Sequence, residues 1–98
     1  MRLDKFLKVS RLIKRRTLAK QICDAGRVTV GDRVAKASTD VGVGDTLSIR
    51  YGNKTVTVEV RKILEHPRRD EALELYHVVS TVARNDVEPE YVDDEDSD

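Results

Sequence analysis

The chain has few of the residues on which small domains rely for cross-links, metal binding or aromatic stacking. Its 98 residues include no tryptophan, one phenylalanine and one cysteine, Cys23. One cysteine excludes an internal disulfide framework and any zinc cluster built from several cysteines. The single phenylalanine and the absence of tryptophan leave little aromatic surface on which nucleic-acid bases could stack. These absences fit a protein of a reducing compartment that carries no metal site.

Long apolar runs and catalytic groupings are also missing. No run approaches the roughly 20 apolar residues that a membrane span needs, and the first eight residues already contain three basic side chains. We therefore expect one cytoplasmic domain without a membrane partner. His66 and His77 show no ligand spacing, and no nucleophile can be matched with a base. We expect no catalytic residue, no metal and no cofactor, and hence a protein that is not an enzyme.

The charged residues are distributed very unevenly along the chain. The formal net charge is zero, but residues 1–36 carry eleven Lys and Arg against three acids, a net charge of +8. Residues 71–98 carry only Arg84 against ten acids, a net charge of −9. Such a concentration of positive charge in a small folded unit is typical of proteins that bind phosphate groups. The first third of the chain is therefore the candidate functional region.

A first helix is predicted at the start of this basic region. Leu3, Phe6 and Leu7 share one helical face, and the helix should end near Ser10. Asp4 lies in the first turn, where a carboxylate can accept backbone N–H bonds or orient a nearby arginine.

A second helix is predicted from about Arg15 to Ala25. Arg16 and Lys20 are four residues apart and should face outward, on the side opposite an apolar stripe. We expect Cys23 to lie in that stripe as a small buried residue rather than to act as a redox thiol. Gly26 should adopt a left-handed conformation and end the helix. The N-terminal turn then combines free N–H groups with two arginines, and we expect it to be able to bind a phosphate.

From Arg27 onward, apolar residues recur at every second position instead of at helical spacing, which predicts strands. The expected strands cover residues 27–30, 33–36, 46–51 and 54–60. The expected class is α+β, with two short helices packed on a small antiparallel sheet of four or five strands. The segment from Glu71 to Val79 is expected to form a short amphipathic helix docked on the sheet. We expect one domain over residues 1–79, with its core in residues 1–60, and a disordered acidic tail over residues 80–98.

The first half of the chain resembles the S4 RNA-binding domain. The resemblance is carried by Arg2 to Leu7, Arg15 to Ala19, Gly26 to Val30, Lys36 to Ser38 and Val43 to Asp45. It covers about residues 1–60 and depends on the order of these motifs rather than on one of them. The family usually has Asn-Gly after the first strand, where this chain has Gly31-Asp32. Members bind structured RNA with the two helices and the loop that enters the sheet, called the αL motif.

Within that family, the run from Met1 to Lys20 is most similar to the stand-alone S4-domain factors of bacterial ribosome quality control. The resemblance implies a factor that binds ribosomal RNA of the large subunit and peptidyl-tRNA, and we expect it to be a monomer. It further implies help in the template-free addition of alanine to stalled chains, alongside a partner factor that recruits alanyl-tRNA. Two alternatives stay open. One is a role like that of the small S4-domain heat-shock protein, which recycles large subunits that carry nascent chains. The other is a protein-interaction module that uses the acidic tail.

The expected RNA contacts are the exposed cations of the αL motif. The leading contacts are Arg2, Arg15, Arg16 and Lys20, and the supporting contacts are Lys5, Lys8, Arg11, Lys14, Thr17, Gln21, Arg27 and Lys36. Asp4 and Gly26 are expected to orient and shape this surface. A basic face is more often a solvated surface than a binding site, but the family pattern favours RNA here. Because phosphate contacts position a protein without reading bases, we expect recognition of an RNA shape.

Overall fold

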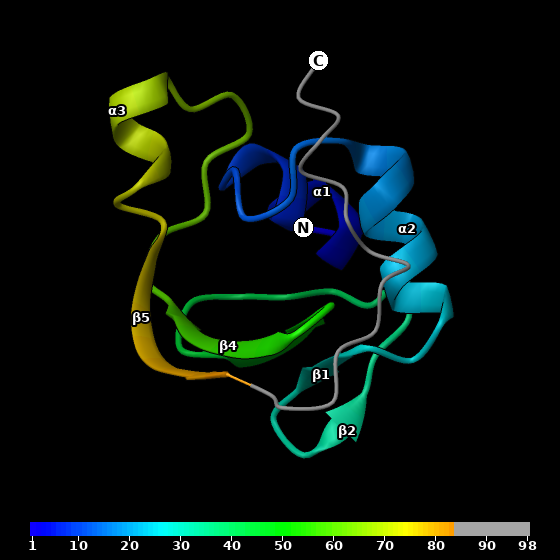
Figure 1. Cartoon of the computed structure of the whole chain (residues 1–98). Coiled ribbons are helices and arrows are strands. Elements are labelled where there is room, and N and C mark those ends of the chain that lie inside the picture. Colours follow the sequence, from blue (N-terminus) through cyan, green and yellow to red (C-terminus); the bar gives the residue numbers. More distant parts are fainter. Residues whose placement is uncertain (84–98) are drawn as a thin grey trace.

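The computed structural model describes residues 1–83. The elements are α1 (Leu3–Val9), α2 (Arg16–Asp24), β1 (Val28–Val30), β2 (Arg33–Val34), β3 (Thr46–Tyr51), β4 (Lys54–Val60), α3 (Arg69–Ala72) and β5 (Tyr76–Ala83). The five strands form one antiparallel sheet in the order β2-β1-β3-β4-β5. Helices α1 and α2 lie together over one face of this sheet (Figure 1). The expected α+β class is confirmed.

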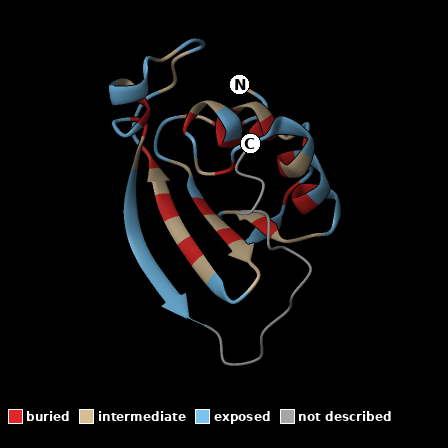
Figure 2. Cartoon of the chain, turned by 45° about the horizontal axis from the view of Figure 1, so that its top comes forward, coloured by how far each residue is buried: buried red, intermediate tan, exposed pale blue. Residues whose placement is uncertain are grey.

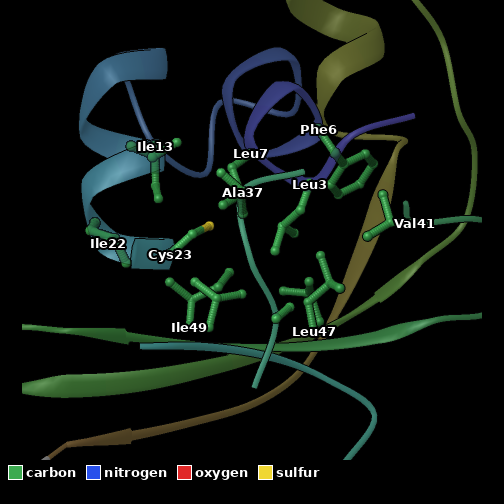
Figure 3. Close-up of a cluster of buried hydrophobic side chains, with 14 of the residues drawn as sticks. Leu3, Phe6, Leu7, Ile13, Ile22, Cys23, Ala37, Val41, Leu47 and Ile49 are labelled. Carbon is green, nitrogen blue, oxygen red and sulfur yellow. The ribbon is translucent and has the colours of Figure 1, made fainter. Parts of the chain in front are cut away.

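The core lies between the two N-terminal helices and the sheet. Side chains alternate across β3 and β4, so that one face of each strand is buried and the other is more exposed. The close-up in Figure 3 shows the buried groups converging from both layers, among them Leu3, Phe6, Leu7, Ile13, Ile22, Cys23, Ala37, Val41, Leu47 and Ile49. Full burial of one such large side chain contributes about 1.5–3 kcal/mol, so this cluster holds the helices in place on the sheet.

Both N-terminal helices end within a residue of the predicted positions. The Ser10 hydroxyl, which is buried after α1, donates to the carbonyl of Leu7 at 3.3 Å. After α2, Gly26 has φ +76° and its N–H donates to the carbonyl of Cys23 at 2.9 Å. A Cβ at Gly26 would meet only Val34 Cγ1, at 3.9 Å. The left-handed backbone, rather than lack of space, therefore favours glycine there.

Cys23 is a buried thiol at the interface of α2 with the sheet. Its exposed fraction is 2%. Burial, with smaller contributions from the charges of Asp4 and Asp24, raises the pKa of Cys23 to about 11. The thiol is therefore protonated at neutral pH, as suits a small apolar residue and not a reactive thiolate.

Backbone hydrogen bonds hold the start of the chain against the loop between β2 and β3. The N–H of Leu3 donates to the carbonyl of Thr39 at 2.7 Å, and the N–H of Val41 donates to the carbonyl of Met1 at 2.8 Å. These bonds fix the backbone of Arg2 against the loop, at a position that no local sequence pattern specifies.

The C-terminal part corrects two expectations. The helix predicted from Glu71 to Val79 is wrong beyond its first turn, because α3 covers only Arg69–Ala72 and Tyr76–Ala83 form β5. Without β5, strand β4 would end the sheet with an unpaired edge, and β5 pairs with that edge from Val60↔Tyr76 to Lys54↔Ala83. Backbone pairing with that edge outweighs the helical spacing of the apolar residues. Strand β5 also includes residues 80–83, which were expected to belong to the tail; the rest of the expected tail lies outside the described residues.

Candidate RNA interface

Two arginines from different helices meet at one buried carboxylate. Arg2 precedes α1, and its Nε and Nη2 donate to the two oxygens of Asp4 at 3.2 and 3.3 Å. Arg16 opens α2, and its Nη2 reaches Oδ1 of the same residue at 3.5 Å. The side chain of Asp4 is 4% exposed, whereas those of the two arginines are each 50% exposed. We call these three residues the arginine clamp. It presents outward-facing N–H groups held by a group that RNA cannot reach.

The charge of Asp4 is maintained by the arginines around it. Burial on its own raises the pKa of the Asp4 carboxyl, but the hydrogen bonds and charges of Arg2 and Arg16 outweigh that effect, and the net pKa is lowered. The carboxylate is therefore ionised at neutral pH and can hold both guanidinium groups in place.

Helix α2 presents a polar stripe next to the clamp. Ala19, Ile22 and Cys23 are buried, whereas Arg16, Thr17, Lys20, Gln21 and Asp24 are exposed, as are Lys14 and Arg15 before the helix. Figure 2 shows this exposed side in pale blue along the helix. No side-chain cap is formed at the α2 N-terminus within residues 1–83. The backbone N–H groups of the first turn therefore lie beside exposed cations, a combination that suits phosphate oxygens.

Lys5 and Lys8 in α1, with Arg11 just after the helix, form a second group of candidate contacts. Lys5 is only 28% exposed and forms an ion pair with Glu65 in the connector between β4 and α3. Its charge is thus partly neutralised, and we rank it below Lys8 and Arg11, which are exposed. The ion pair also places the connector beside α1, which sequence spacing alone gives no means of predicting.

Two supporting residues occupy the edges of the surface. Arg27 follows the C-terminal end of α2 and is half-buried, with its Nε and Nη1 inaccessible to solvent. Lys36 is exposed in the loop that receives the N-terminus, where its N–H donates to Thr39 Oγ1 at 2.9 Å. Of the two, Lys36 is the better placed to meet a phosphate.

Arg11 stands out for its backbone conformation. It directly follows the last residue that caps α1, and its φ is +65°, in the left-handed region that favours glycine. An exposed arginine kept at such a position suggests that its side chain has a function, because strained conformations cluster at functional sites.

We expect Arg11→Gly to raise the free energy of unfolding by about 0.5–1 kcal/mol, because it relieves the left-handed strain. The same change should weaken RNA binding about threefold, because it removes an exposed cation of the candidate interface. Urea unfolding and RNA titration measure the two effects. Arg11→Ala is the matched control, since it removes the charge and keeps the strain. It should lose affinity equally without the gain in stability. Unchanged RNA affinity in both variants would place Arg11 outside the interface.

The sequence pattern did not identify Glu65, His66 and Pro67 as neighbours of α1. They line a surface hollow together with Lys8 and Arg11. Pro67 was recognisable as an interruption in the connector, but the contact partner of that connector depends on the tertiary fold.

Among residues 1–83, no helix is long and apolar enough to cross a membrane. In the same part of the chain, no three His, Cys, Asp or Glu side chains gather closely enough to hold a metal ion.

Comparison with known proteins shows the family and the fold. The family model described as the S4 domain matches residues 1–47. The chain is 63% identical over 78 residues to the RQC P-site tRNA stabilizing factor of Halalkalibacterium halodurans, which covers 80% of this chain and 89% of that protein. It is 53% identical over 79 residues to the factor of the same name from Bacillus subtilis, with 81% and 92% covered. The trimeric structure of Vibrio cholerae Heat Shock Protein 15 matches with a TM-score of 0.75 at 33% identity and covers 82% of each chain.

Proposed function

Because the chain belongs to the S4-domain family of RQC P-site tRNA stabilizing factors, we propose that it is a non-enzymatic factor that binds the large ribosomal subunit during ribosome quality control. On this proposal it acts in the cytoplasm and contacts both ribosomal RNA and peptidyl-tRNA. It assists the template-free addition of alanine to stalled chains, together with the factor that recruits alanyl-tRNA. The name of the relatives, which refers to P-site tRNA, supports the tRNA contact.

The observation that carries the proposal is the arginine clamp. Free arginine side chains lose conformational entropy when they bind phosphate, but Asp4 already holds Arg2 and Arg16 in one place. A preorganised pair of guanidinium groups at the N-terminal ends of two helices fits the closely spaced phosphates of folded RNA better than scattered surface charge does. The flanking cations then add sequence-independent affinity.

Co-sedimentation with ribosomal subunits tests the proposal. Large subunits that carry peptidyl-tRNA, empty large subunits and small subunits are compared at low and high salt. We expect the protein to favour the loaded large subunits and its binding to fall steeply with salt, because each neutralised phosphate releases counterions. Binding to small subunits alone, or binding indifferent to salt, would contradict an electrostatic contact with the large subunit.

A second candidate function is the recycling of large subunits that carry nascent chains, and the similarity to the Vibrio cholerae Heat Shock Protein 15 structure favours it. A purified alanine-tailing reaction separates the two functions. If the protein assists tailing, its addition should lengthen the alanine tails on stalled chains. Binding to loaded subunits with no change in tail length would support recycling instead.

A further inference from the structure

A hollow of about 260 Å³ opens between the C-terminal end of α1 and the connector that follows β4. It is lined by Lys8, Val9, Arg11, Glu65, His66 and Pro67. Its residues come from two segments far apart in sequence, and the ion pair between Lys5 and Glu65 holds them together. The clamp lies at the other end of α1, so this hollow is a distinct feature of the interface.

The lining combines three kinds of group. Lys8 and Arg11 supply cations, and neither forms an ion pair with any other residue in the described part of the chain. His66 supplies an aromatic ring and Pro67 an apolar ring. Glu65 supplies a carboxylate that is 63% exposed, so it can accept hydrogen bonds beyond the one from Lys5.

We propose that this hollow binds one unstacked guanine nucleotide of the bound RNA, a proposal that rests on the proposed function. The phosphate of the nucleotide lies between Lys8 and Arg11, and the base stacks on the rings of His66 and Pro67. The Glu65 carboxylate accepts hydrogen bonds from the adjacent N1–H and N2–H donors of guanine. Sequence-specific RNA recognition usually targets such splayed-out bases rather than base pairs.

The carboxylate decides which base fits. Guanine is the only common RNA base that presents two adjacent donors on its Watson–Crick edge, and a carboxylate has two oxygens with which to accept them. Uracil presents a single donor there, N3–H, between two carbonyl oxygens that the carboxylate repels, so it offers Glu65 one hydrogen bond where guanine offers two. The hydrogen bond and charge of Lys5 lower the pKa of Glu65, so the group stays ionised at neutral pH. A nucleotide matches both parts of this lining, because its phosphate pairs with Lys8 and Arg11 while its base presents N–H donors to Glu65.

The test uses two RNA hairpins that differ in a single bulged nucleotide, guanine or uracil. The full-length protein should bind the bulged-guanine hairpin about tenfold more tightly. Glu65→Ala should reduce this preference to about twofold, while the bulged-uracil hairpin is bound no more weakly than before, because a negative charge has been removed. Glu74→Ala is the matched control: it also breaks an exposed carboxylate–lysine pair, with Lys62, and should keep the full preference.

A second pair of variants tests the stacking surface. His66→Ala should weaken binding of the bulged-guanine hairpin about fivefold, whereas His77→Ala, at an exposed histidine of β5, should leave it unchanged. Equal affinity of the wild type for the two hairpins, or an undiminished preference in Glu65→Ala, would overturn the guanine site while leaving the proposed function standing. Unchanged RNA affinity in both Glu65→Ala and His66→Ala would likewise overturn the nucleotide site. If the wild type bound neither hairpin, the guanine site would be overturned, whereas the proposed function depends on the separate co-sedimentation with large subunits.

Discussion

Replacing Arg16 with alanine is expected to weaken binding to large subunits about tenfold, because a hydrogen bond to a charged group contributes about 1.5–3 kcal/mol. Arg16 is half-exposed and is held by the buried Asp4, so its guanidinium is already in place when RNA arrives. A plot of the logarithm of the binding constant against the logarithm of the salt concentration should also be less steep, with its slope smaller in magnitude by about one. Co-sedimentation or filter binding at several salt concentrations measures both effects.

Arg69→Ala is the control for this experiment. Arg69 is an exposed arginine in α3, outside the αL motif, and its removal makes the same change in net charge. Its loss should change the binding constant less than twofold, because Arg69 lies outside the clamp that this experiment tests. If both variants lost affinity equally, net charge rather than the clamp would account for binding.

Replacing Asp4 with asparagine is expected to weaken RNA binding about fivefold, although it removes a negative charge from the interface. Electrostatics alone predicts the opposite sign, because a more positive surface attracts RNA more strongly. The decrease is expected because Arg2 and Arg16 lose the carboxylate that orients them. Asp24→Asn makes the same chemical change at an exposed aspartate of α2 and should leave affinity unchanged or raise it. Tighter binding by Asp4→Asn would show that Asp4 does not position the arginines.

The same substitution should lower the free energy of unfolding by about 1–2 kcal/mol at neutral pH, because it removes charge-assisted hydrogen bonds to a buried group. The pKa of Asp4 is lowered in the folded protein, so its contribution to stability is present above the unfolded pKa of about 3.9 and is lost as pH falls through the folded pKa. Acid unfolding of wild type and Asp4→Asn should therefore converge below about pH 4. If the free energies of unfolding of the two proteins kept a constant difference down to the lowest pH measured, this account of Asp4 would be contradicted.

Local sequence patterns predicted most of the fold correctly because the relevant forces act between near neighbours. The spacing of Leu3, Phe6 and Leu7 specifies the buried face of α1, and Gly26 specifies the end of α2. The alternation of apolar and polar residues predicts the first and last residues of β3 and β4 correctly. The prediction failed at β5, where spacing compatible with a helix was outweighed by an unpaired strand edge that exists only after the sheet has formed.

The sequence by itself determined which residues are basic, which helix faces they occupy and that they belong to an S4-type motif. Only the tertiary structure decided that Arg2 and Arg16 meet at Asp4, and that Glu65 and His66 lie beside Lys8. These contacts join segments whose separation in sequence leaves no local signal, since they depend on how the N-terminus docks in the loop before β3 and how the connector returns to α1. A charge pattern can indicate that RNA is bound, but the arrangement of the donors depends on the packed core beneath them.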